Sequence, residues 1–205
     1  MLAALTLAAA TALPTLPIAV HTSPSVSRSL ATSALEEAAA IWRNAGVRLV
    51  WTIVDEKGGS PRALPSGAAP DVLRVLIDDD PGTTLDIGVA IGWVNFYDDE
   101  PHPEIHLSYL NAVTGLARAC PPGALGRMMR SELDEVVAIG LGRALAHELG
   151  HYLLGSKVHS GKGLMHADWS PTELFGADRP FLGLDAVQRE ALASKLVTSA
   201  LVTKR

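Results

Sequence analysis

The chain has 205 residues, of which 48% are hydrophobic and 19% charged, and its formal net charge is −5. This composition is typical of a folded globular domain and excludes an intrinsically disordered chain. The negative balance and the lack of a Lys/Arg-rich run argue against a nucleic-acid partner, which would require a basic face. Cys120 is the only cysteine. A disulfide framework and a cysteine-rich zinc site are therefore excluded, and a metal would need histidine and carboxylate ligands.

The sequence begins with a short apolar segment, MLAALTLAAATA, that ends in Ala10-Thr11-Ala12. The small-x-small ending is typical of a signal-peptidase site, although no Lys or Arg precedes Arg28. Residues 1–12 thus predict a secretory signal and a secreted, periplasmic or extracellular location, with a cytoplasmic location as the alternative. The run is too short to span a bilayer and is interrupted by Pro14 and Pro17, so no stable membrane span is predicted.

Alternating hydrophobic residues and β-branched residues predict strands, separated by stretches rich in Gly, Pro and Asp. The five predicted strands are residues 17–23, 47–54, 72–77, 89–96 and 104–110. Residues 55–70 predict a loop, and the acidic stretch 97–103 predicts a turn between the last two strands.

Helical spacing of apolar residues predicts three helices, residues 25–45, 131–154 and 185 to about 202. Gly46 and Gly155 follow the first two helices as stop signals. The order of the elements predicts one α/β or α+β layered domain over residues 17–205, with strands of mixed direction.

The second predicted helix carries His147-Glu148-Leu149-Gly150-His151. Residues four apart on a helix lie on one face, about 5–6 Å apart, so His147 and His151 can hold one metal ion. Zinc lowers the pKa of a bound water towards about 7, and Glu148 is placed to take the proton from that water. A catalytic zinc site needs a third protein ligand and an open position.

His159 is the predicted third ligand, because Gly155 ends the helix and lets the chain return towards the metal. Two rivals remain open: His166, which follows Met165, and Glu173, which would suit a peptidase with a glutamate ligand. Ser170-Pro171-Thr172-Glu173-Leu174 is typical of a helix start, where glutamate is common for capping, and this is the preferred interpretation of Glu173.

Residues 146–165 resemble the metzincin metallopeptidases, whose pattern is HExxH, a turn glycine, a third histidine and a methionine in a tight turn. His159-Ser160 and Gly163-Leu164-Met165 are similar to segments of matrix-metalloproteinase-like catalytic domains, and the whole run resembles a group of bacterial hypothetical metallopeptidases. Here Gly155 and His159 follow His151 by four and eight residues rather than by the three and six of the family, and Ala167 stands where some members have Tyr.

The resemblance implies an α+β, zincin-like fold in which a twisted mixed sheet packs on a backing helix and an active-site helix, with a C-terminal helix. It implies Zn²⁺ held by His147, His151 and His159, Glu148 as general base, and Met165 beneath the metal.

The predicted function is a zinc-dependent peptidase acting on a peptide or protein substrate. The substrate would extend along a sheet edge supplied by residues 104–110 or 89–96. The alternatives are a non-catalytic zinc-binding interaction domain and a zinc peptidase with Glu173 as the third ligand.

Overall fold

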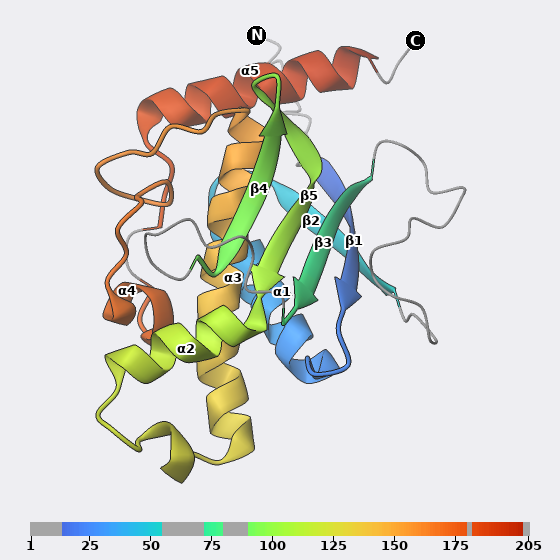
Figure 1. Ribbon diagram of the computed structural model, residues 1–205. Helices are drawn as coiled ribbons and strands as arrows, with labels where there is room; N and C mark the ends of the chain where they lie inside the picture. The colour runs from blue at the N-terminus through green and yellow to red at the C-terminus, as the bar shows by residue number, and fades with distance from the viewer. Residues whose placement is uncertain (1–13, 55–71, 80–89, 180–181, 203–205) are drawn as a thin grey trace, which may run out of the picture.

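The computed structural model describes residues 14–54, 72–79, 90–179 and 182–202. The predicted secretory signal, residues 1–12, and the predicted loop, residues 55–70, lie outside these ranges. The described residues form a sheet with helices packed on one of its faces (Figure 1). No helix in these ranges is long and apolar enough to cross a membrane.

The sheet has five strands in the order β2-β1-β3-β5-β4. Their bounds are β1 (Thr15–Thr22), β2 (Arg48–Val54), β3 (Leu73–Asp78), β4 (Gly92–Tyr97) and β5 (Glu100–Ser108). The neighbours β2-β1, β1-β3 and β3-β5 pair in parallel, whereas β4 pairs with β5 antiparallel. The predicted mixed strand direction is confirmed, and β4 forms one edge of the sheet.

The last two strands differ from the prediction in extent and place. The turn between them contains only Asp98 and Asp99, whose φ angles of 49° and 64° form a tight hairpin. β5 starts at Glu100 and includes Pro101 and Pro103, which lie before its pairing with β3 begins. Proline lacks an N–H and is tolerated there because β3 leaves that side of the strand unpaired. Of the two alternative substrate edges that were predicted, residues 104–110 are wrong, since β5 is bonded on both sides, whereas residues 89–96 overlap the edge strand β4.

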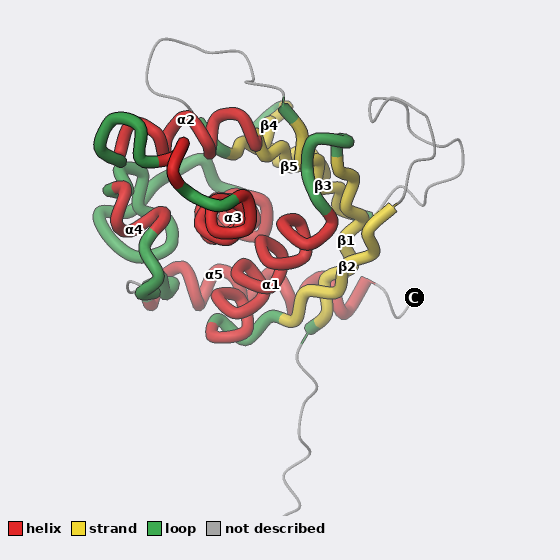
Figure 2. The backbone as a smooth tube through the Cα atoms, turned by 90° about the horizontal axis from the view of Figure 1, so that it is seen from below, coloured by secondary structure: helices red, strands yellow, loops and turns green. Residues whose placement is uncertain are grey.

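Two helices, α1 (Arg28–Asn44) and α3 (Arg130–Leu154), pack against the sheet and each other. Figure 2 shows α3 end-on at the centre, with the sheet and the other helices around it. The remaining helices are α2 (Tyr109–Ala119), the 3-10 turn Leu125–Arg127, α4 (Pro171–Phe175) and α5 (Ala186–Val202). The prediction missed α2, which begins directly after β5, where the Ser108 hydroxyl accepts the Asn111 N–H at 3.1 Å.

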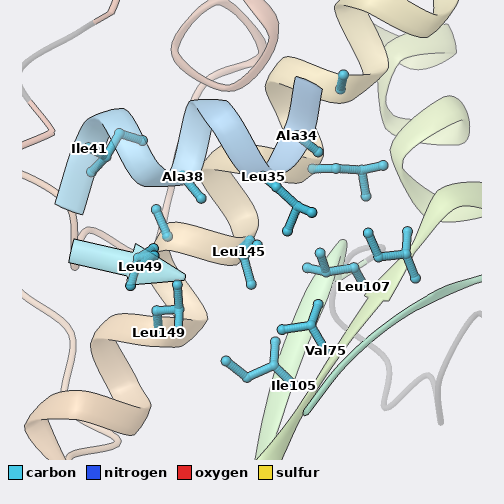
Figure 3. Packing of buried hydrophobic residues seen from close by; sticks show 14 of the residues in the cluster. Ala34, Leu35, Ala38, Ile41, Leu49, Val75, Ile105, Leu107, Leu145 and Leu149 are labelled. Carbon is cyan, nitrogen blue, oxygen red and sulfur yellow. The ribbon is translucent and has the colours of Figure 1, made fainter. Parts of the chain in front are cut away.

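The core lies between α1, α3 and the inner face of the sheet (Figure 3). Figure 3 shows side chains of α1 and α3 meeting Val75, Ile105 and Leu107 of the sheet. Burying each such side chain contributes about 1.5–3 kcal/mol. The two helices can approach closely because Gly142 has no side chain. A Cβ at this position would lie only 2.5 Å from the Ala34 carbonyl oxygen of α1. The core thereby fixes the position of α3, the helix that carries the HExxH motif.

Candidate metal centre

The last turns of α3 place His147 and His151 on one face, as their spacing predicts. Their ring centroids are 4.7 Å apart. The neighbouring residues Ala146 and Leu149 are fully buried in the core. Beside them, the Trp42 indole N–H of α1 donates to the Ala146 carbonyl at 3.1 Å. The rotation of α3 about its axis is therefore set by packing on its opposite face.

The chain reverses direction directly after the helix. Gly155 is the C-cap in the left-handed region, with φ 58°, which glycine adopts without steric cost. The Ser156 N–H then donates to the His151 carbonyl at 3.2 Å, and the His151 Nδ1 lies 2.6 Å from the Ser156 carbonyl oxygen. This reciprocal pair takes up the two additional residues of the connection and directs the following residues back to the motif.

His159 reaches the two motif histidines through this turn. Its Nε2 lies 3.2 Å from the His151 Nε2, which in turn lies 3.1 Å from the His147 Nε2. One ligand atom from each of the three residues falls within a 4.8 Å cluster. Two nitrogens bound to a tetrahedral zinc at about 2.0–2.1 Å would be about 3.3–3.4 Å apart. The two Nε2–Nε2 distances at His151 therefore fit a single Zn²⁺.

The protonation of these rings also fits a metal. The His147 Nδ1 lies 2.8 Å from the Leu164 carbonyl oxygen, and the His151 Nδ1 faces the Ser156 carbonyl oxygen. A carbonyl only accepts, so both Nδ1 atoms carry the proton and both Nε2 atoms present lone pairs to each other. Burial lowers the pKa of His147 to about 4 and also lowers the pKa of His151, which keeps both rings neutral. Converging lone pairs without a proton between them are stabilised by a cation.

Glu148 lies between α3 and the edge strand. Its side chain is buried, which raises the pKa of its carboxyl group to about 8, while the Val94 backbone hydrogen bond opposes that rise. Gly92 of β4 makes room for it, because a Cβ there would lie 3.0 Å from the Glu148 Cγ and 2.9 Å from the Leu107 Cδ2. The carboxyl group is thus held at the wall of the cleft that contains His147 and His159.

Met165 packs against the side of α3 that carries Gly150. It is 1% exposed, and a Cβ on Gly150 would lie 2.2 Å from its sulfur. The preceding Gly163 has φ 78°, and the Leu164 carbonyl accepts from His147. This turn therefore packs against α3 through Met165 and orients the His147 imidazole through the Leu164 carbonyl.

The two rival ligands lie outside the histidine cluster. Glu173 is the third residue of α4, and its Oε2 accepts the Ser170 N–H at 2.8 Å in a capping box. These hydrogen bonds from Ser170 lower the pKa of Glu173. His166 lines the same cleft as His147 but is not among the clustered ligand atoms. The capping interpretation of Glu173 thus agrees with its geometry.

The cleft beside the cluster has a volume of about 590 Å³. Its residues come from the segment that leads into β4, from α3, from His159 and from the chain after Met165 as far as α4. Trp169 is one of them, and its ring meets the His147 ring edge-to-face with centroids 5.8 Å apart. Trp169 was not among the site residues predicted from the sequence. Its position three residues after the histidine that follows Met165 was the available signal.

A buried ion cluster lies one helical turn before His147. Arg143 is fully buried; its Nε donates to the Glu37 Oε1 at 3.3 Å and its Nη2 to the Asp178 carbonyl at 3.0 Å. Its Nη1 donates to the Glu173 carbonyl, and Arg179 binds the other oxygen of Glu37 at 2.9 Å. These contacts connect the segment 173–179, which follows Met165, to α1 and α3.

Comparisons with known proteins agree with this architecture. The crystal structure of an archaemetzincin from Methanopyrus kandleri superposes with a TM-score of 0.51 at 16% identity, covering 89% of this chain and 96% of that one. A zinc-dependent peptidase from Methanocorpusculum labreanum gives a TM-score of 0.52 at 13% identity, covering 85% and 99%. No protein-family model and no curated protein matches the sequence. The shared fold confirms the predicted α+β class with a mixed sheet.

Proposed function

We propose that this chain is a zinc-dependent peptidase of the metzincin type, in which His147, His151 and His159 hold the zinc. The observation that carries the proposal is the convergence of three imidazole Nε2 atoms, two of them in rings whose Nδ1 atoms are committed to carbonyl oxygens. The two solved structures of the same fold, described as an archaemetzincin and a zinc-dependent peptidase, support it.

Glu148 is proposed as the general base. A bound zinc ion supplies a Lewis acid and makes a water more acidic at neutral pH. The Glu148 carboxylate would accept a proton from the attacking water and deliver it to the leaving amine nitrogen. Its hydrogen bond with the Val94 backbone on β4 supports a proton transfer beside the sheet edge. Met165 would support the histidines from beneath, through its packing on Gly150.

The substrate is proposed to bind as an extended peptide along β4. This strand is an edge of the sheet, and its first residue, Gly92, lines the cleft with Glu148 and His159. A peptide that added to this edge would have its main chain held by hydrogen bonds and its scissile bond brought to the cleft.

An open cleft favours this proposal over a non-catalytic zinc-binding interaction domain. Such a domain would be expected to close the metal off, whereas His159 is exposed and the cleft reaches two of the three histidines. The glutamate-ligand alternative is disfavoured because the Glu173 carboxylate accepts hydrogen bonds from both the backbone and the hydroxyl of Ser170.

The test is cleavage of casein by zinc-loaded wild type and Glu148→Gln, with zinc content measured in both. Wild type should cleave, and the variant should keep its zinc but lose activity by about a hundredfold or more. Glu190→Gln, an exposed change on α5, is the matched control and should remain active. Equal activity of Glu148→Gln and wild type would contradict the base assignment. Full zinc occupancy without cleavage of casein or a peptide library would contradict the peptidase.

A further inference from the structure

Two consecutive residues after the methionine turn, Asp168 and Trp169, line the metal cleft together with His147, Glu148 and His159. Asp168 is exposed. Among the described residues, no donor or cation engages its carboxylate. Its carboxylate therefore lies at the cleft without a protein partner.

The other carboxylates near this cleft are engaged. Glu148 is buried and accepts the Val94 N–H, and Glu173 caps α4 through Ser170. The described residues that line the cleft include no Lys and no Arg. Asp168 is thus the carboxylate of the described cleft lining that has no protein partner, and no Lys or Arg of that lining competes for it.

The remaining wall suits the stem of a long side chain. Trp169 is half-buried and offers an indole ring, and apolar surface comes from Ile91 just before β4, Ala144 of α3 and Leu174 of α4. Aromatic rings attract ammonium and guanidinium groups, and the methylenes of Lys and Arg pack on apolar surface while the charged end remains polar. A carboxylate, an aromatic ring and an apolar wall together recognise a basic side chain.

We infer that this cleft selects substrates with Lys or Arg at one of the two positions that flank the scissile bond, recognised by the Asp168 carboxylate and the Trp169 ring. The inference rests on the proposed peptidase function and names its substrate class. It makes Asp168 and Trp169 specificity residues, which touch the substrate side chain and take no part in the proton transfer.

The first test is to map wild-type cleavage sites in a casein digest by mass spectrometry. A peptide is then made from a mapped site with either Lys or norleucine at the flanking position. Wild type should show Lys and Arg enriched at one flanking position and a kcat/KM about threefold to tenfold higher for the Lys peptide. Asp168→Asn should bring that ratio close to one, and Asp168→Lys should shift the mapped sites to Asp and Glu. Asp178→Asn, an exposed loss of the same charge outside the cleft, should change nothing.

A second readout does not depend on turnover. The same two peptides are titrated into zinc-loaded Glu148→Gln, with and without Asp168→Asn, by fluorescence anisotropy. The Lys peptide should bind more tightly only when Asp168 is present. Cleavage without a basic preference, or a preference that persists in Asp168→Asn, would overturn the inference while leaving the peptidase intact. A zinc-loaded wild type that neither binds nor cleaves any peptide would overturn both.

Discussion

Two adjacent turns of α3 bury polar side chains in opposite ways. Around Arg143, the guanidinium, the Glu37 carboxylate and two carbonyl groups satisfy one another inside the protein. One turn later, His147 and His151 satisfy only their Nδ1 atoms, and their Nε2 atoms face each other and His159. The polar atoms of the first turn satisfy one another within the protein, whereas the second turn directs imidazole lone pairs towards one point. Buried polar groups that pair fully with one another indicate a structural role, and buried lone pairs that converge indicate a binding site.

The largest expected effect is a loss of folding stability when Arg143, in the first of these two turns, is replaced. Arg143→Met should lower the free energy of unfolding by about 3–5 kcal/mol, because it leaves the Glu173 and Asp178 carbonyls without this donor and leaves the buried Glu37 carboxylate with only the exposed Arg179 as its partner. Urea unfolding of the metal-free protein measures it. Arg130→Met, which removes an exposed pair with Asp134 on the same helix, should cost about 0.5 kcal/mol or less. Similar losses in both variants would show that the Arg143 cluster is not structural.

The next largest effect concerns zinc affinity at the turn of α3 that carries His147 and His151. His147→Ala should weaken zinc binding at least about a hundredfold, since two ligands hold the ion less tightly than three and lose the orientation set by Leu164. Competition with a chromophoric chelator measures the zinc affinity. His166→Ala, which removes a cleft histidine outside the cluster, should keep near-normal affinity. If His166→Ala lost zinc and His147→Ala or His159→Ala did not, the ligand assignment would be wrong.

The smallest expected effect is the pH dependence of the metal-free protein. The carboxyl pKa of Glu148 is raised from 4.5 in the unfolded chain to about 8 in the fold. Between these values the unfolded state releases the proton that the folded state retains, so stability falls as pH rises. Burial of His147 lowers its pKa from 6.5 to about 4, which has the opposite sign and acts only below pH 6.5.

From pH 6.5 to 8, therefore, stability should fall at a slope approaching about 1.4 kcal/mol per pH unit. Glu148→Gln should remove most of this slope. Urea unfolding in chelator-containing buffers across that range provides the measurement. A slope that Glu148→Gln leaves unchanged would mean that another group titrates there.

The parts of the fold that could be predicted from sequence are those encoded locally. The spacing of His147 and His151 and the stop signal at Gly155 fix the motif on its helix, because helical geometry depends on near neighbours. His159 was predicted as the third ligand despite its longer connection. The turn that accommodates the additional residues depends on hydrogen bonds between His151 and Ser156, and the spacing alone does not reveal them.

What the sequence could not predict depends on distant partners. Whether residues 104–110 form an edge is decided by which strands pair beside them, and β3 occupies that side. The helix α2 follows β5 without a Gly or Pro to separate them, so residues 109 and 110 were included in the strand. The partners of Arg143 come from Glu37, 106 residues earlier, and from the chain after residue 172. The signal over residues 1–12 stays a prediction.

X-ray absorption spectroscopy at the zinc edge, with zinc per chain measured by elemental analysis, tests the three-histidine zinc site most directly. We predict one zinc per chain and a first shell containing three imidazole nitrogens at about 2.0–2.1 Å, reduced to two in His159→Ala. A well-folded wild type that takes up no zinc on reconstitution, or a bound zinc whose shell is unchanged in His159→Ala, would contradict it.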